Sequence, residues 1–101
     1  MPESSKVVDS WAMVAWIRDE AGAESVERFF QQADAGKLQL LMSWINVGET
    51  FYILVRKRFL QIAEQFLVRL PSLPIRLVLP NEDDIIAAAR LKSCYREDGQ
   101  N

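Results

Sequence analysis

A chain of 101 residues is long enough for one domain with a hydrophobic core, and its composition, 50% apolar and 26% charged, excludes a disordered chain. It contains no His, which excludes nucleophilic schemes with a histidine base and leaves catalysis to carboxylates, Lys, Arg or an oxygen-bound metal. The net charge of −2 gives no overall attraction to nucleic acid. One cysteine, Cys94, allows no internal disulfide and fits a cytoplasmic location.

The first predicted element is a short strand that runs directly into a helix. Residues 6–8 are rich in β-branched side chains and predict the strand. Residues 11–17 are apolar on every side, which predicts a buried helix. Asp9 stands between them, at the carboxyl end of the strand, where open α/β sheets place their ligand sites.

The rest of the chain predicts alternating helices and strands. Ser43 is a good N-cap, and Gly36 stands where a left-handed C-cap belongs. The predicted segments are a helix from about 24 to 35, a strand at 38–42, helices at 44–57 and 59–70, a strand at 75–79, a helix from 82 to about 92, and a disordered polar tail at 96–101. This order predicts a single three-layer α/β/α domain, residues 1–101, with a short parallel sheet and right-handed crossovers.

Two acids in this pattern have a structural and a chemical interpretation. Asp9 is a preferred N-cap residue, but its carboxylate at the end of a buried strand also favours a cation as partner. Glu49 lies at the margin of the apolar face of its helix, where an exposed rim position is equally compatible with the pattern. Gly48 beside it costs about 1 kcal/mol relative to Ala in a helix. This cost predicts close backbone packing at Gly48.

Considered together, the two acids indicate a metal site. If the first two strands are neighbours, Asp9 and Glu49 both point into the crevice at the carboxyl edge of the sheet. Two carboxylates at one place repel each other unless one is protonated or a cation lies between them. Oxygen ligands without His or Cys suit Mg²⁺ or Mn²⁺.

Several motifs resemble the PIN domain of bacterial VapC-type toxins over about residues 6–92. They are Lys6-Val7-Val8-Asp9-Ser10, Ser43-Trp44-Ile45-Asn46-Val47-Gly48-Glu49-Thr50-Phe51-Tyr52, Leu73-Pro74-Ile75 and Ala89-Arg90-Leu91-Lys92. The resemblance implies Mg²⁺-dependent cleavage of RNA and an antitoxin partner. It also implies that Asp9 and Glu49 are catalytic metal ligands, with Ser10 and Asn46 as polar supports.

The chain departs from the family pattern at its C-terminal end. The family places a third and often a fourth acid on later elements, and Asp98, in a polar tail, does not match them. We therefore expect an incomplete PIN domain that lacks the C-terminal strands and helix. Two carboxylates hold a cation less firmly than three or four, so we expect weak or lost cleavage.

A protein-interaction module is the alternative function. The helices at 11–17 and 59–70 offer more apolar surface than a small sheet covers, which favours an antitoxin or a second copy as partner. We expect a homodimer, formed by edge pairing or by exchange of elements. A phosphate-accepting receiver domain is disfavoured because Leu79-Pro80 ends the third strand, and no glycine-rich nucleotide motif is present.

Aromatic and basic side chains have simpler interpretations. The spacing of Trp11, Trp16, Trp44, Phe51 and Tyr52 favours core positions over base-stacking positions. The basic run at 56–58 ends a predicted helix, where a solvated cap is favoured over an RNA contact.

Overall fold

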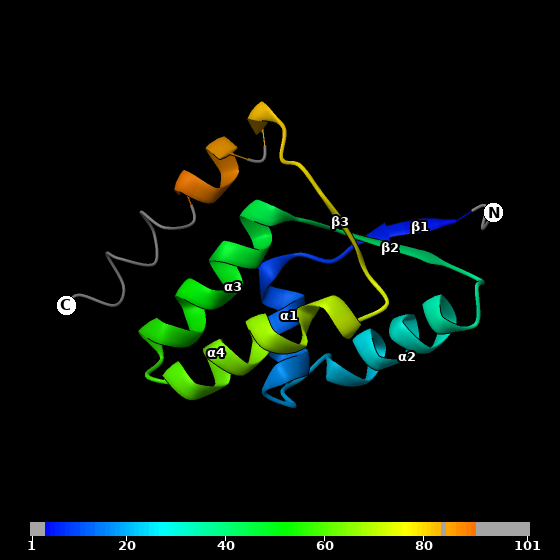
Figure 1. The fold of residues 1–101 in the computed structure, drawn as a ribbon, viewed down its shortest axis with the longest axis horizontal. Helices are drawn as coiled ribbons and strands as arrows, with labels where there is room; N and C mark the ends of the chain where they lie inside the picture. The colour runs from blue at the N-terminus through cyan, green and yellow to red at the C-terminus, as the bar shows by residue number, and fades with distance from the viewer. Residues whose placement is uncertain (1–3, 84, 91–101) are drawn as a thin grey trace.

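The computed structural model describes residues 4–83 and 85–90, and it forms an α/β fold with a parallel three-stranded sheet of order β1-β2-β3 (Figure 1). Residues 82–83 and 85–90 are also helical. The elements are β1 (Ser5–Val7), α1 (Ser10–Ile17), α2 (Ala23–Asp34), β2 (Gln39–Ser43), α3 (Trp44–Arg56), α4 (Leu60–Arg69), the 3₁₀ turn η1 (Leu70–Ser72) and β3 (Arg76–Val78).

The predicted order of strands and helices is confirmed, and so are two of the local signals. Ser43 is the N-cap of α3, and its hydroxyl accepts a hydrogen bond from the Ile45 N–H at 2.9 Å. Gly36 follows α2 with φ of 77°, the left-handed conformation that glycine adopts without steric cost. The predicted tail at 96–101 and the end of the last helix lie outside the described residues.

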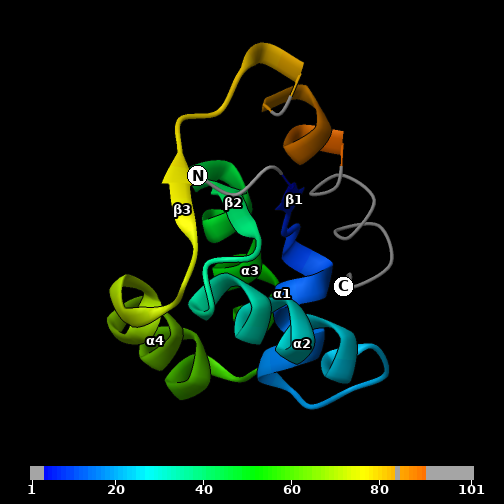
Figure 2. The same ribbon diagram turned by 90° about the vertical axis from the view of Figure 1, so that its right-hand side faces the viewer.

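The strand order determines where the helices lie. Both crossovers, from β1 to β2 and from β2 to β3, step in the same direction across the sheet. Right-handed connections therefore place α1 to α4 on one side of the strands, as the two views in Figures 1 and 2 show. The helical residues 85–90 lie beside the first turns of α3.

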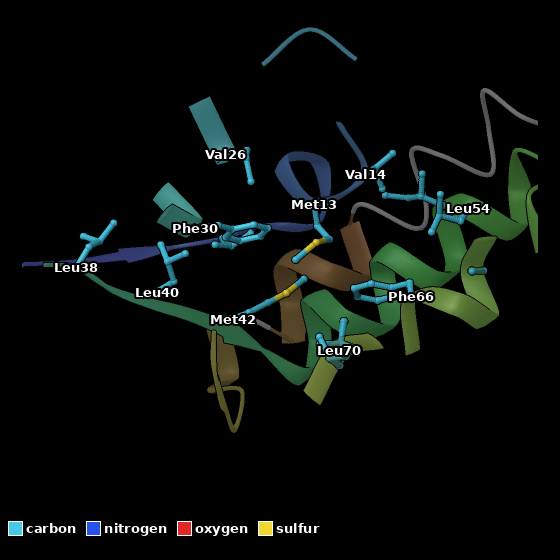
Figure 3. Packing of buried hydrophobic residues seen from close by; sticks show 14 residues of the cluster. Met13, Val14, Val26, Phe30, Leu38, Leu40, Met42, Leu54, Phe66 and Leu70 are labelled. Atoms are coloured by element: carbon cyan, nitrogen blue, oxygen red, sulfur yellow. The ribbon is translucent and has the colours of Figure 1, made fainter. Parts of the chain in front are cut away.

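One hydrophobic core lies between the sheet and these helices (Figure 3). Leu40 and Met42 alternate with the less buried Leu41 along β2, so one face of the strand enters the core. Phe30 of α2 packs edge-on against Trp16 of α1, with 4.6 Å between the ring centroids. No described helix has the length and apolarity needed to cross a membrane.

The aromatic prediction is confirmed for three residues and wrong for two. Trp16, Phe51 and Tyr52 are partly buried and pack against the core. Trp11 and Trp44, however, expose 45% and 49% of their surface. Both stand in the first turn of a helix, just beyond the carboxyl end of a strand, and lie outside the hydrophobic core.

The prediction for Gly48 is wrong. Gly48 is exposed, and a Cβ placed on it would have no described atom within 4 Å apart from its own chain neighbours and helix backbone. Close backbone packing therefore does not explain a glycine at this position.

Candidate active site

The register of the sheet places the starts of α1 and α3 at the same edge. Val7 pairs with Leu41, and the Val8 N–H donates to the Leu41 carbonyl at 2.8 Å. Asp9 and Ser43 each follow these paired residues by two positions, so they occupy equivalent places on neighbouring strands. Each caps the helix that follows it, and α1 and α3 are in contact.

Asp9 is an exposed N-cap residue, as the structural interpretation predicted. Its Oδ1 accepts a hydrogen bond from the Ala12 N–H at 2.8 Å, and its backbone is extended. Within residues 4–83 and 85–90, Oδ2 accepts no hydrogen bond. Ser10, which the resemblance assigned as a polar support, is buried in the first turn of α1.

Glu49 is buried, with 4% of its surface exposed, and the interpretation as an exposed rim residue is wrong. Glu49 is one of the residues that line a groove of about 360 Å³. Trp44, Ile45 and Gly48 contribute to one wall, and Ile85, Ala88 and Ala89 form the other. Burying a carboxylate is costly unless it is paired or binds a cation, so the burial of Glu49 requires a compensating interaction.

The region around Asn46 contains a polar residue that the sequence analysis missed. Thr50 is fully buried, and its hydroxyl donates to the main-chain oxygen of Asn46 at 2.7 Å. Asn46 itself is half-buried one turn before Thr50. A threonine inside a helix can donate to the main-chain oxygen one turn earlier, whatever residue stands there, so a threonine in the predicted helix is the signal that would have indicated this contact.

The structure places the two acids on elements that start at the same edge. Asp9 is not among the described residues that line the groove of Glu49. The described part of the chain contains no group of three or more His, Cys, Asp or Glu side chains that could hold a metal ion. Binding of one cation by both carboxylates therefore stays a prediction.

The basic run lies away from this edge. Arg56, Lys57 and Arg58 are exposed at the C-terminal end of α3. A helix of 13 residues is about 20 Å long, so the run lies at the opposite end of α3 from Ser43.

A family model described as the PIN domain matches residues 6–98. No curated protein and no solved structure matched the chain. PIN domains are a nuclease family whose members generally depend on divalent metal ions and act on RNA. The match covers most of the chain, and the α/β fold with a short parallel sheet agrees with it. The chain belongs to the PIN domain family.

Proposed function

We propose that this chain is a VapC-like ribonuclease, the toxin of a cytoplasmic toxin–antitoxin system, which hydrolyses phosphodiester bonds of RNA with Mg²⁺ or Mn²⁺ bound by Asp9 and Glu49. The observation that carries the proposal is the buried carboxylate of Glu49, on a helix that starts beside Asp9 at the carboxyl edge of the sheet. RNA cleavage that is lost in Asp9→Asn is the direct test.

The donor set fits a hard cation. Mg²⁺ is commonly bound by one or two carboxylates, with water and substrate phosphates completing its shell. A bound cation would supply an activated water and charge stabilisation at the scissile phosphate. The Ala12 N–H holds Oδ1 of Asp9, which fixes the orientation of its carboxylate. The positive ends of the α1 and α3 dipoles lie at the same edge and favour an anionic substrate.

The same geometry supports weak rather than efficient cleavage. The proposed site uses two carboxylates, and the described residues contain no group of three or more candidate ligands. A cation held by two carboxylates binds less firmly than one held by three or four. We therefore expect a high concentration of Mg²⁺ to be needed for any cleavage.

We propose an antitoxin as the protein partner, because a second groove has a lining that suits an amphipathic segment. This groove, about 590 Å³, lies between α1, α2 and α4. Its floor includes Trp16, Ile62 and Phe66, and its rim includes Glu24 and Glu27. An amphipathic segment with apolar side chains toward the floor and basic side chains toward the rim is complementary to it.

A synthetic amphipathic helical peptide rich in Leu and Lys is expected to bind this groove, measured by titration calorimetry. Ile62→Glu should weaken binding at least about tenfold, because it places a charge in the apolar floor. Val68→Glu is the matched control, since Val68 is exposed on α4 and does not line the groove. Equal loss in both variants would contradict the proposed docking site.

Self-association through β1 is a second partner proposal. The Gln39 N–H donates to the Ser4 carbonyl, and the Val8 N–H donates to the Leu41 carbonyl. The main-chain groups of Ser4 and Val8 therefore face β2. Because successive residues of a strand alternate, those of Ser5 and Val7 face the outer edge of β1, where no described strand pairs. Val7 is also 71% exposed. Two copies pairing through β1 would satisfy both edges by one symmetric contact.

Light scattering at micromolar concentration is expected to give twice the mass of one chain. Val7→Pro should give a monomer, because it removes a donor at the open edge without removing a β1–β2 hydrogen bond. Val7→Ala keeps the donor and should remain dimeric. A monomeric unsubstituted chain would refute the homodimer, and a dimeric Val7→Pro variant would refute pairing through this edge.

A further inference from the structure

The turn between α3 and α4 gathers positive charge from two parts of the chain. The basic run at 56–58 ends α3, and its three side chains are exposed. Arg18, at the end of α1, lies against the same turn, with 3.9 Å between its Cζ and the ring centroid of Phe59. Helical periodicity alone favoured a solvated cap for this run, because periodicity contains no information about a cation that another helix places beside it.

The backbone at Arg58 is one that glycine adopts more easily than arginine. Its φ is 69°, in the left-handed region. The Arg58 N–H donates to the Val55 carbonyl at 2.9 Å. The Phe59 N–H donates to the Leu54 carbonyl at 2.9 Å, and this pair of bonds ends a helix with glycine at the position of Arg58 in most cases. Gly36 has the left-handed conformation after α2. An arginine at this place retains strain that a glycine would remove, so ending α3 does not account for the side chain.

The charges at this turn are only partly neutralised. Among the residues that the structure describes, neither Lys57 nor Arg58 forms an ion pair. Arg18 Nη1 lies 3.5 Å from Glu20 Oε2, and Asp19 beside it is exposed, so these two acids reduce the contribution of Arg18. The negative end of the α3 dipole offsets about half of one charge. Net positive charge remains at Lys57 and Arg58.

RNA is the polyanion that this charge fits best. The described lining of the Glu49 groove contains no Lys or Arg, and the net charge of the chain is −2. Neutralisation of phosphates by Lys and Arg supplies much of the affinity of nucleic-acid-binding proteins, so a ribonuclease of this composition needs a basic surface elsewhere. An acidic protein segment is the competing ligand. It is disfavoured because the partner groove, with Glu24 and Glu27 at its rim, suits a basic segment.

We propose that Lys57 and Arg58, with Arg18 beside them, form a second RNA-binding site that holds the phosphate backbone at the far end of α3 from the cleaved bond. The inference rests on the proposed nuclease function and deepens it by adding an anchoring site for the substrate. The 13 residues of α3 span about 20 Å, and one strand advances about 3.4 Å per nucleotide. The anchored phosphates therefore lie about six nucleotides from the cleaved bond. Phosphate contacts are independent of base sequence.

The test measures the affinity of a labelled oligouridine that spans both ends of α3 for the Asp9→Asn protein, in which cleavage is expected to be lost. Lys57→Gln and Arg58→Gly should each weaken binding about 5- to 10-fold at low salt and reduce the salt dependence of log affinity by about 0.7. Arg58→Gly should also raise the urea midpoint of unfolding, because glycine relieves the left-handed backbone. Lys37→Gln is the matched control, since Lys37 is exposed at the amino edge of the sheet, and it should bind like its parent.

In the protein with Asp9 intact, Arg58→Gly should raise KM for this oligomer and leave KM unchanged for one too short to reach the turn. Parent-like affinity and salt dependence in both Lys57→Gln and Arg58→Gly would overturn the second site, while cleavage that depends on Asp9 would leave the nuclease proposal standing. If these variants lose affinity for oligoglutamate and not for RNA, the turn binds protein and the inference is wrong. If they lose RNA affinity but cleavage does not depend on Asp9, the nuclease proposal fails and the RNA site stands. Absence of RNA binding in the parent overturns the inference.

Discussion

Replacing Asp9 with Asn is expected to lower Mg²⁺-dependent RNA cleavage by about a hundredfold or more while leaving the free energy of unfolding nearly unchanged. Asn caps a helix about as well as Asp, so the hydrogen bond from the Ala12 N–H at 2.8 Å is preserved. The neutral amide is a much weaker ligand for a hard cation than a carboxylate. Metal stabilisation of the transition state is worth several kcal/mol, and each 1.36 kcal/mol is about tenfold in rate.

Three variants complete this experiment, measured as RNA cleavage rate and as urea unfolding. Asp9→Ala should lose cleavage and also about 1 kcal/mol of stability, because the cap is removed. Glu49→Gln should lose cleavage to a similar extent. Asp34→Asn, at an exposed position in the last turn of α2, should behave like the parent in both measurements. Parent-like cleavage by Asp9→Asn would make Asp9 a helix cap alone.

Replacing Phe30 with Ala is expected to destabilise the protein by about 3–5 kcal/mol. Phe30 is 4% exposed, belongs to the core beneath β2, and packs edge-on against Trp16 at 4.6 Å. Its loss opens a cavity that rigid neighbours do not fill. Domains of this size are stable by roughly 5–15 kcal/mol, so the variant should lose a large part of its stability. Urea unfolding followed by tryptophan fluorescence measures the effect.

Phe29 provides a matched control on the same helix. It is partly buried against the core, and the Lys6 ammonium lies 5.1 Å from its ring centroid. Phe29→Ala removes an exposed cation–π contact worth about 0.5–1 kcal/mol together with part of a packing contact. We expect it to cost clearly less than Phe30→Ala. An equal loss in the free energy of unfolding for the two variants would contradict the assignment of Phe30 as the more important core residue.

The sequence alone determined the order of the elements and the positions of the caps. Ser43 and Gly36 mark the ends of elements because capping and left-handed backbone conformations depend on residues within one turn of the chain. The α/β class follows equally directly, since alternating strand and helix patterns leave few connections that a chain can make. The identity of Asp9 and Glu49 as candidate ligands also came from their places in these local patterns and from the family resemblance.

The burial of these side chains depends on contacts between elements that are far apart in the chain. Glu49 and Trp44 lie on the same helix. The sequence pattern left a rim position open for Glu49 and favoured a core position for Trp44, yet Glu49 is buried and Trp44 is half exposed. The wall formed by Ile85, Ala88 and Ala89 comes from a segment more than thirty residues away in the chain. Exposure depends on what other elements place against a surface, and helical periodicity contains no information about those neighbours.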